Sequence, residues 1–238
     1  MNELKLKKNI YKIKPLANII IPIYRSIKKT KNFSSGSYWE KRYKSGGNSG
    51  AGSYGRLAQF KADIINKFVK DQSINTILEM GSGDGNQLEL FNLPHYIGFD
   101  ISKTSIVYCA KKFRDDNDKS FFLYDPVCFV DNQNIFNVDM TMSLDVIFHL
   151  VEDDVFDKYM HDLFFMAKQY VIIYSSNTED SRLSQAQHVR HRKFTDWVDT
   201  NAKKWKLEKK IKNKFGLKED LIDIDESPAD FYIYKKTK

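Results

Sequence analysis

Cysteine is scarce in this 238-residue sequence: only Cys109 and Cys128 occur, and they form no CxxC motif. The five histidines show no zinc-binding spacing either, so the sequence predicts no metal site and no disulfide framework. We expect both cysteines to be buried free thiols of a protein in the reducing cytoplasm. The chain also lacks the run of ~20 apolar residues that a membrane-spanning helix needs. No integral membrane segment is therefore expected.

Residues 1–33 are basic, and their apolar centre at 16–24 is short and interrupted by proline. This segment has no small-residue cleavage site, so a signal peptide is not expected. We interpret it as an N-terminal extension that packs on a single domain spanning 34–238. The alternative is peripheral contact with an anionic membrane surface.

Basic residues outnumber acidic ones, 38 to 31, which gives a formal charge of +7. This excess is typical of a protein with an anionic partner, but a solvated lysine-rich surface explains it equally well. Because the basic residues form no long stripe and no RNA-binding module is visible, nucleic acid is not the first choice of partner.

Strand-like and helix-like segments alternate along most of the chain. Short apolar runs alternate with segments whose apolar residues recur at helical spacing. This order predicts an α/β fold with a mostly parallel sheet and helices on both faces. Strands are expected at 75–81, 96–100, 120–125, within 139–150, and at 169–177, 205–213 and 230–236. Helices are expected at 56–71, from 86 onward, and at 102–113, 153–167 and 191–202.

Residues 34–55 are rich in Gly and Ser, yet they also contain the aromatic residues Tyr38, Trp39, Tyr43 and Tyr54. A flexible linker of low complexity seldom carries such side chains. We therefore interpret this segment as a mobile lid loop that closes over a site.

A glycine-rich turn, GSGDG over 81–85, follows the strand that contains Glu79. Glycines in such a turn let the backbone approach a nucleotide closely. A Rossmann dehydrogenase spaces its glycines GxGxxG, whereas the spacing here is GxGxG. The next strand ends in Asp100, whose carboxylate can accept hydrogen bonds from ribose hydroxyls. That carboxylate alone leaves both NAD and S-adenosylmethionine open.

The pattern ExGxGxG, which begins at Glu79, resembles the first motif of class I S-adenosylmethionine-dependent methyltransferases. The resemblance continues at "FLYDP", where the family often has an aspartate near the adenine, and at "SLDVIFHL", which follows its fourth strand. It implies a Rossmann-like fold with a seven-stranded, mostly parallel sheet and an antiparallel last strand. It also implies S-adenosyl-L-methionine as cofactor and S-adenosylhomocysteine as product. The implied cofactor-binding residues are Glu79, Gly81, Ser82, Gly83, Gly85, Asp100, Ile101, Tyr124, Asp125 and Asp145.

Two of these aspartates also have a plain structural interpretation. Asp125 precedes Pro126 and is equally typical of a turn, and Asp145 is equally typical of a helix cap.

His149 is the leading candidate for a general base, because it follows the fourth strand and an imidazole suits proton transfer. Its segment "DVIFHL" also resembles the "ILHL" segment of phosphobase methyltransferases, whose histidine pairs with an N-terminal tyrosine. This resemblance implies a partner such as Tyr43, with Tyr38 and Tyr54 as alternatives. Simple helix packing is the alternative role of His149.

The cluster "HVRHRKF" over 188–194 follows the fifth strand, where this fold often builds its acceptor site. Guanidinium groups suit phosphate or carboxylate, so we expect a small anionic acceptor, phosphorylated or sugar-linked. The alternative is a basic helix start on the surface. The expected substrate-binding residues are Tyr38, Tyr54, His188, Arg190, His191 and Arg192.

The segments "YWEKRYKSGGNSGAGSYG" and "VRHRKFTDW" together are similar to bacterial methyltransferases of capsule or lipopolysaccharide biosynthesis. This similarity implies that a precursor of a surface polysaccharide is methylated on a hydroxyl, phosphate or phosphoramidate-type oxygen. Other functions stay open: N-methylation of a small phosphorylated amine, RNA methylation, NAD-dependent dehydrogenation, or a non-catalytic protein that retains the cofactor fold.

Overall fold

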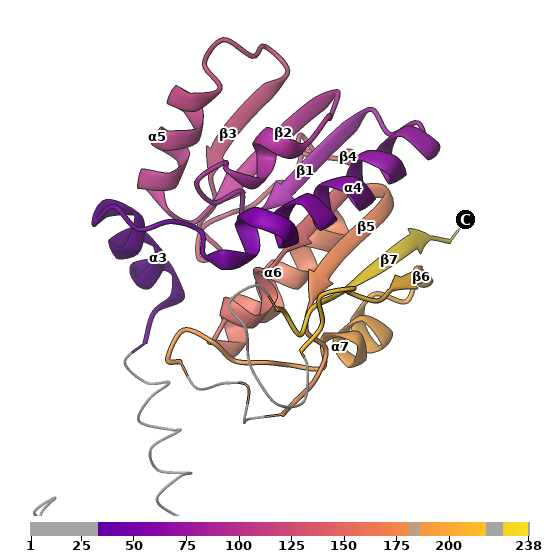
Figure 1. Ribbon diagram of the computed structural model, residues 1–238. Coiled ribbons are helices and arrows are strands. Elements are labelled where there is room, and N and C mark those ends of the chain that lie inside the picture. Colours follow the sequence, from indigo (N-terminus) through magenta and orange to yellow (C-terminus); the bar gives the residue numbers. More distant parts are fainter. Residues whose placement is uncertain (1–32, 181–182, 184–185, 218–225, 238) are drawn as a thin grey trace, which may run out of the picture. The chain divides into compact units, whose positions relative to one another are not determined.

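The computed structural model describes residues 33–180, 183, 186–217 and 226–237. Within them, seven strands form one sheet with helices on both faces (Figure 1). In chain order the strands are β1 (Thr76–Met80), β2 (His95–Asp100), β3 (Lys119–Leu123), β4 (Val138–Leu144), β5 (Ala167–Ser175), β6 (Trp205–Ile211) and β7 (Asp230–Lys236). Across the sheet their order is β3-β2-β1-β4-β5-β7-β6, and β7 alone runs antiparallel to its neighbours. The predicted sheet, including its antiparallel last strand, is confirmed.

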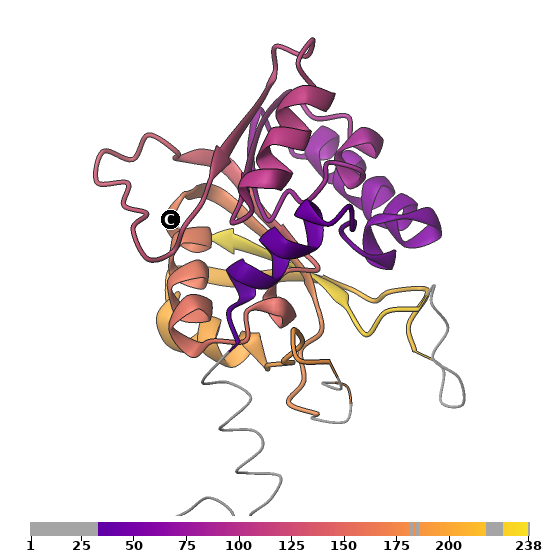
Figure 2. The same cartoon turned by 90° about the vertical axis from the view of Figure 1, so that its left-hand side faces the viewer.

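The apolar strands of the sheet centre are buried from both sides by helices, as their continuous hydrophobic runs predict. The sheet has a hydrophobic core on each face. Successive residues of β1 point to opposite faces, so Ile77 packs in one core cluster and Leu78 in the other. Figure 2 shows the two helix layers on either side of the sheet. One layer contains α4 (Gly55–Asp71) and α5 (Lys103–Lys112), and the other contains α6 (Asp153–Phe165) and α7 (Phe194–Asn201).

Two segments differ from the sequence-based expectations. Residues from 86 onward form only the 3₁₀ turn η2 (Gln87–Leu90), because Pro94 and strand β2 follow too closely for further helical turns. Residues 35–44, expected in a lid loop, form the helix α3 (Ser35–Lys44), and only the rest of that segment is irregular apart from the short turn η1 (Ala51–Ser53). Between Gly36 and Gly46 the sequence contains no glycine to interrupt this helix.

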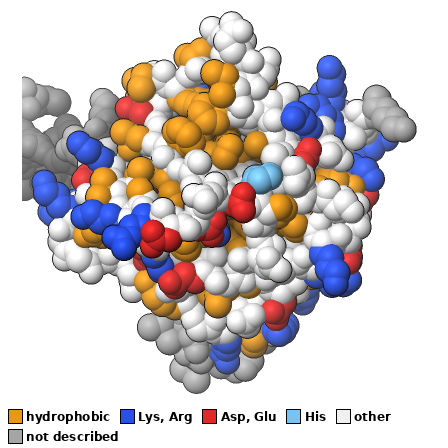
Figure 3. Space-filling view, turned by 90° about the horizontal axis from the view of Figure 1, so that it is seen from above, with side chains coloured by type: hydrophobic (Ala, Val, Ile, Leu, Met, Phe, Trp, Pro, Cys, Tyr) orange, Lys and Arg blue, Asp and Glu red, His pale blue; other side chains and the backbone are white. Residues whose placement is uncertain are grey.

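The structure allows three expectations to be compared with it: the distribution of charge, the burial of the cysteines and the lack of a membrane-spanning helix. On the face seen in Figure 3, basic side chains lie interspersed with acidic ones and with an area of hydrophobic side chains. Cys109 is buried as expected, but Cys128 is exposed. No helix among the described residues has the length and apolar character needed to cross a bilayer. The N-terminal extension and its membrane contact were assigned to 1–33, which lie outside the described residues apart from Phe33.

Candidate functional site

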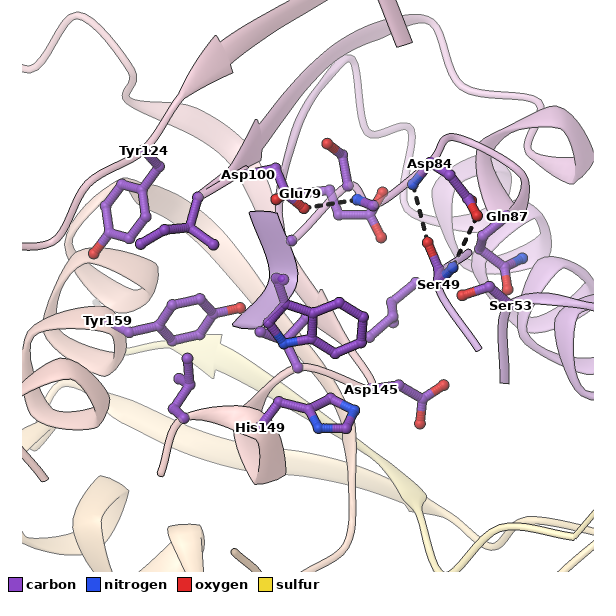
Figure 4. A pocket seen from close by; sticks show the side chains of 18 of the residues that line it. Ser49, Ser53, Glu79, Asp84, Gln87, Asp100, Tyr124, Asp145, His149 and Tyr159 are labelled. Atoms are coloured by element: carbon purple, nitrogen blue, oxygen red, sulfur yellow. Dashed lines mark hydrogen bonds between the residues drawn. The ribbon is translucent and has the colours of Figure 1, made fainter. Parts of the chain in front are cut away.

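A pocket opens at the carboxyl ends of β1, β2 and β4, where parallel strands of such sheets bring their functional residues together (Figure 4). It encloses about 860 Å³ of empty space, its open mouth included. Residues 35–54, which we call the cover segment, contribute to its wall. The lining residues are Trp39, Tyr43, Ser49, Ser53, Lys61, Glu79, Gly81, Ser82, Gly83, Asp84, Gln87, Asp100, Ile101, Tyr124, Pro126, Leu144, Asp145, Val146, His149, Leu150, Val155 and Tyr159.

The glycine turn after β1 needs glycine at the positions that face the pocket. Gly81 and Gly83 have φ angles of 91° and 59°, which other residues rarely adopt. A side chain on Gly81 would collide with Val146, and one on Gly83 with the Ser49 hydroxyl. Gly85 also has a positive φ, but it faces α5, where a Cβ would lie 2.8 Å from the Phe113 ring. Gly85 therefore serves the packing of α5 rather than the pocket wall.

Every backbone N–H of this turn is already used within the protein. The acceptors, in chain order, are the Phe99 carbonyl for Gly81 (2.7 Å) and Ser82 (2.9 Å), the Asp100 carboxylate for Gly83 (2.9 Å), the Ser49 hydroxyl for Asp84 (2.9 Å), the Ser82 carbonyl for Gly85 (3.3 Å) and the Asp84 carboxylate for Asn86 (3.0 Å). A pyrophosphate bound at a glycine turn needs free N–H groups, usually at the start of a helix. Here no N–H from 81 to 86 is free, and only a 3₁₀ turn follows.

Two buried carboxyl groups lie at the strand ends beside the turn. Asp100 accepts hydrogen bonds from the N–H groups of Gly83 (2.9 Å) and Ser102 (2.8 Å), and burial raises its pKa to about 6. Glu79 accepts a 2.6 Å bond from the Tyr96 hydroxyl, and burial raises its pKa to about 7. Both carboxyl groups are partly protonated near neutral pH and ionise readily when a ligand stabilises the anion.

Asp145, at the end of β4, forms an ion pair that the sequence did not reveal. Its Oδ2 lies 2.6 Å from Nζ of Lys61, whose side chain is only 1% exposed. Lys61 also lies over the Tyr174 ring, 5.4 Å from its centroid. The sequence could have indicated a buried lysine, because Lys61 occupies a core-facing position of α4, midway between the buried Leu57 and Ile65.

The polar part of the pocket carries more negative than positive charge. Four carboxyl groups line it, those of Glu79, Asp84, Asp100 and Asp145, whereas Lys61 is the single lysine or arginine among the lining residues described. Such a wall repels a pyrophosphate and favours a ligand with a cationic centre.

One side of the pocket is apolar and suits a flat ring. Tyr124 and Tyr159 lie together on this side, opposite Ser49, Asp84 and Gln87 (Figure 4). The Tyr124 hydroxyl donates to Asp162 (2.8 Å) and the Tyr159 hydroxyl to the Met80 carbonyl (2.7 Å), so both tyrosines present ring carbons to the cavity. Further apolar residues of the lining include Ile101, Pro126, Leu150 and Val155.

His149 lines a further edge of the pocket and has a defined tautomer. Its Nδ1 lies 2.8 Å from the carbonyl of His188, which fixes the proton on Nδ1 and leaves the Nε2 lone pair as an acceptor. The indole of Trp39 packs edge-on against it, with ring centroids 4.9 Å apart. Burial, with the positive charge of Arg42 as a lesser cause, lowers the pKa of His149 to about 3. The imidazole is therefore neutral at physiological pH.

The three tyrosines proposed as partners of His149 contact other groups in the structure. The Tyr43 hydroxyl bonds with Ser49 Oγ (3.0 Å) beside the glycine turn, and the Tyr54 hydroxyl donates to Asp84 (2.9 Å). Tyr38 instead stacks on His188, at 4.4 Å between centroids. The residue in contact with His149 from α3 is Trp39, which comes from the same aromatic cluster of the sequence.

The arginines expected to hold the acceptor bond in the structure to main-chain carbonyls and to a carboxylate. Arg192 donates to the carbonyls of Leu150 (2.8 Å) and Val151 (3.0 Å), and Arg190 also donates to Val151 (3.0 Å). Both guanidinium groups pair with Asp153, at 2.8 and 2.9 Å. They fasten the connection after β5 to the start of α6, and neither lines the pocket.

Asp125 and His191 also lie outside the pocket. The exposed Asp125 accepts a 2.9 Å bond from the Val127 N–H. Such a local bond is typical of a turn residue, which was the alternative interpretation of Asp125. His191 bonds with the Ser176 hydroxyl (2.5 Å). Of the predicted site residues, the pocket brings together Tyr43, Glu79, Gly81, Ser82, Gly83, Asp100, Ile101, Tyr124, Asp145 and His149. The predicted residues outside its lining are Tyr38, Tyr54, Gly85, Asp125, His188, Arg190, His191 and Arg192.

Comparisons with known proteins support the fold. No protein-family profile and no curated protein sequence matches the chain. Among solved structures, the N-methyltransferase NodS from Bradyrhizobium japonicum WM9, bound to S-adenosylhomocysteine, has a TM-score of 0.59 at 10% identity, covering 76% of this chain and 88% of that one. The methyltransferase domain of bacterial CtHen1 has a TM-score of 0.57 at 19% identity, covering 77% of this chain and 100% of that one.

A third similar structure also contains S-adenosylhomocysteine. It is the magnesium protoporphyrin IX methyltransferase ChlM from Synechocystis PCC 6803, with a TM-score of 0.56 at 13% identity, covering 75% of this chain and 83% of that one. At these identities the similarity establishes the fold. The chain has the class I fold of S-adenosylmethionine-dependent methyltransferases, as its ExGxGxG motif predicted.

Proposed function

We propose that this protein is an enzyme that transfers a methyl group from S-adenosylmethionine to an oxygen of a small acceptor. The observation that carries the proposal is the glycine turn, whose N–H groups are all used internally and whose surroundings are acidic. Such a turn cannot bind the pyrophosphate of NAD, but it suits a cofactor that carries a sulfonium and an amino group.

The described residues fit this cofactor. The Ser82 hydroxyl and the Gln87 side-chain oxygen are buried in the pocket wall without hydrogen-bond partners, and a buried polar group without a partner is unfavourable. Asp100 would accept bonds from the ribose hydroxyls, and the slot beside Tyr124 would take the adenine. The amino acid part would meet Lys61 and the carboxylates beside it.

When bound, S-adenosylmethionine supplies an electrophilic methyl group on a sulfonium, which an acceptor oxygen takes as the carbon–sulfur bond breaks. His149 can hold the acceptor hydroxyl through its Nε2 lone pair and take the proton of that hydroxyl. Its pKa of about 3 is low for a base. The proton becomes strongly acidic as the oxygen–methyl bond forms, however, so even this imidazole can accept it late in the transfer.

We assign the acceptor to small anionic precursors of surface polysaccharides. The similarity of the segments at 38–55 and 189–197 to methyltransferases of capsule and lipopolysaccharide biosynthesis supports this assignment, as does the excess of basic residues. The cover segment serves as the lid. Its contacts to the glycine turn, from Ser49 N–H to Asp84 (2.9 Å) and from Tyr54 to Asp84 (2.9 Å), support this role.

Isothermal titration with S-adenosylhomocysteine and with NAD tests the cofactor assignment. We expect S-adenosylhomocysteine to bind and NAD not to bind; NAD binding alone would overturn the proposal. A turnover screen with phosphorylated small molecules and sugar nucleotides then tests catalysis through release of S-adenosylhomocysteine. Mass spectrometry and NMR of the product distinguish a methylated oxygen from a methylated nitrogen. Cofactor binding without turnover of any acceptor would favour a non-catalytic protein.

The raised pKa of Asp100 predicts a pH dependence of cofactor affinity. Burial sets this pKa at about 6, and only the ionised carboxylate can accept bonds from both ribose hydroxyls. S-adenosylhomocysteine affinity should therefore fall by about tenfold between pH 7 and pH 5. Titration calorimetry at several pH values measures this, and Asp100→Asn should flatten the profile. An equally steep profile in that variant would contradict the assignment.

The same pKa shifts have an opposite consequence for the stability of the ligand-free protein. Asp100 and Glu79 both have a pKa raised above that of the unfolded chain, so the folded state holds their protons more tightly. Their contribution to the free energy of unfolding is therefore lost as the pH rises from about 4 to about 7. Cofactor binding and ligand-free stability should respond to pH in opposite directions.

A further inference from the structure

Arg42, in α3, is a positive charge for which the described part of the chain provides no carboxylate partner, and its guanidinium lies beside Trp39, which lines the pocket. Its Nε donates to the Asn48 carbonyl (2.6 Å), its Nη2 to the Asn48 side-chain oxygen (3.4 Å) and its Nη1 to the Tyr38 hydroxyl (3.3 Å). All of these acceptors are neutral, and among the described residues no carboxylate pairs with Arg42. The group is thus held in place while its charge is uncompensated.

The geometry places this charge next to the reacting edge of the pocket. The Arg42 guanidinium lies 5.5 Å from the centre of the Trp39 ring, and that ring lines the pocket and packs against His149. His188 completes the surroundings, since its ring stacks on Tyr38 at 4.4 Å and lies 5.4 Å from that of His149. The positive charge of Arg42 also lowers the pKa of both histidines.

We propose that Arg42, assisted by His188, binds the anionic group of the acceptor, a phosphate monoester or a carboxylate, while the methylated oxygen lies at His149. This inference rests on the proposed methyl transfer and adds to it the residue that selects the acceptor. A guanidinium has five N–H groups, and three of those of Arg42 are used, so two can still donate to an anion.

The two arginines that the sequence favoured for this role are poor candidates by the same criterion. Arg190 and Arg192 both pair with the carboxylate of Asp153, and both also donate to main-chain carbonyls. Arg42 differs because its hydrogen bonds orient it without neutralising it. An uncompensated, oriented guanidinium is the stronger anion site.

The test uses inorganic phosphate as the probe and the full chain saturated with S-adenosylhomocysteine. NMR of the His149 and His188 rings follows phosphate binding at this site alone. We expect Arg42→Gln to weaken phosphate binding by about tenfold or more, the loss typical of a hydrogen bond between charged groups. Arg42→Lys retains the charge but lacks the oriented N–H groups, so its affinity should lie between those of the unaltered protein and Arg42→Gln. Arg190→Gln and Arg114→Gln, the latter an exposed arginine paired with Asp115, should bind phosphate as the unaltered protein does.

The outcomes separate this inference from the proposed function. If S-adenosylhomocysteine does not bind the unaltered protein, the proposed function fails. If S-adenosylhomocysteine binds but phosphate affinity is the same in Arg42→Gln, or falls only in Arg190→Gln, the inference alone is overturned. A loss of S-adenosylhomocysteine affinity in Arg42→Gln with unchanged phosphate binding would assign Arg42 to the cofactor carboxylate and would also overturn it. Thermal melting of each variant confirms that it is folded.

Discussion

Asp100→Ala is expected to weaken S-adenosylhomocysteine binding by about 10²-fold or more. The carboxylate lies at the end of β2, where it can accept bonds from two ribose hydroxyls, and each hydrogen bond to a charged group contributes ~1.5–3 kcal/mol. It also holds the N–H of Gly83 (2.9 Å), so its loss releases the glycine turn as well. Titration calorimetry at pH 7 measures the affinity.

Asp139→Ala provides a matched control for this variant. Asp139 likewise accepts bonds from two backbone N–H groups, those of Asn75 (3.1 Å) and Thr76 (3.0 Å), but it lies at the amino end of β4, away from the pocket. Both variants should melt at a lower temperature because both leave backbone donors unpaired. Only Asp100→Ala should lose cofactor affinity. An equal loss in both variants would show that fold stability, not ribose binding, explains the effect.

The sequence predicted the floor of the pocket well because the floor follows from strand order. Glu79, Asp100 and Asp145 each stand at the carboxyl end of a parallel strand, and such ends converge at one edge of a sheet. Their chain positions alone therefore placed them together. Only three residues separate His149 from Asp145, so His149 lies at the same edge of the sheet.

The roles of the residues around the pocket depend on pairings that the sequence does not display. Arg192 was predicted to bind an anion, but in the structure it pairs with Asp153, 39 residues earlier in the chain. The sequence allowed Asp125 either to bind a ligand or to stabilise its own turn, and in the structure it accepts the local hydrogen bond from Val127. Arg42 carries no such signal in the sequence, because what distinguishes it is that no carboxylate pairs with it among the described residues.

Helix α3 was missed for a related reason. Its isolated sequence is polar and contains glycine and serine, which favour an irregular segment. Long-range contacts stabilise it instead: Ser35 donates its N–H to Glu152 (2.8 Å), and Glu40 accepts bonds from Ser102 (2.7 Å) and Thr104 (2.7 Å) at the start of α5. Tertiary contacts of this kind override local propensity, and they also bring Trp39 to His149.

His149→Ala is expected to lower turnover by about 10²-fold or more while leaving cofactor affinity nearly unchanged. The bond from Nδ1 to the His188 carbonyl (2.8 Å) leaves Nε2 as the proton acceptor at the pocket. His149→Gln separates two roles of this nitrogen, because a glutamine oxygen can hold an acceptor hydroxyl but cannot take its proton. If proton transfer matters, the glutamine variant should be as slow as the alanine variant. If orientation alone matters, it should retain most of the activity.

The pH profile of turnover completes the test of His149. Because burial lowers its pKa to about 3, the ligand-free imidazole is already neutral at pH 5, so protonation of His149 should cause no loss of turnover near pH 6.5. His161→Ala is the matched control, since His161 is exposed on α6, where it lies 3.6 Å from Asp157 and packs against Trp197 away from the pocket; its turnover should stay normal. Single-turnover measurements with saturating acceptor isolate the transfer step from binding. Normal turnover in His149→Ala would remove His149 from the mechanism, and the acceptor would then have to lose its proton to water.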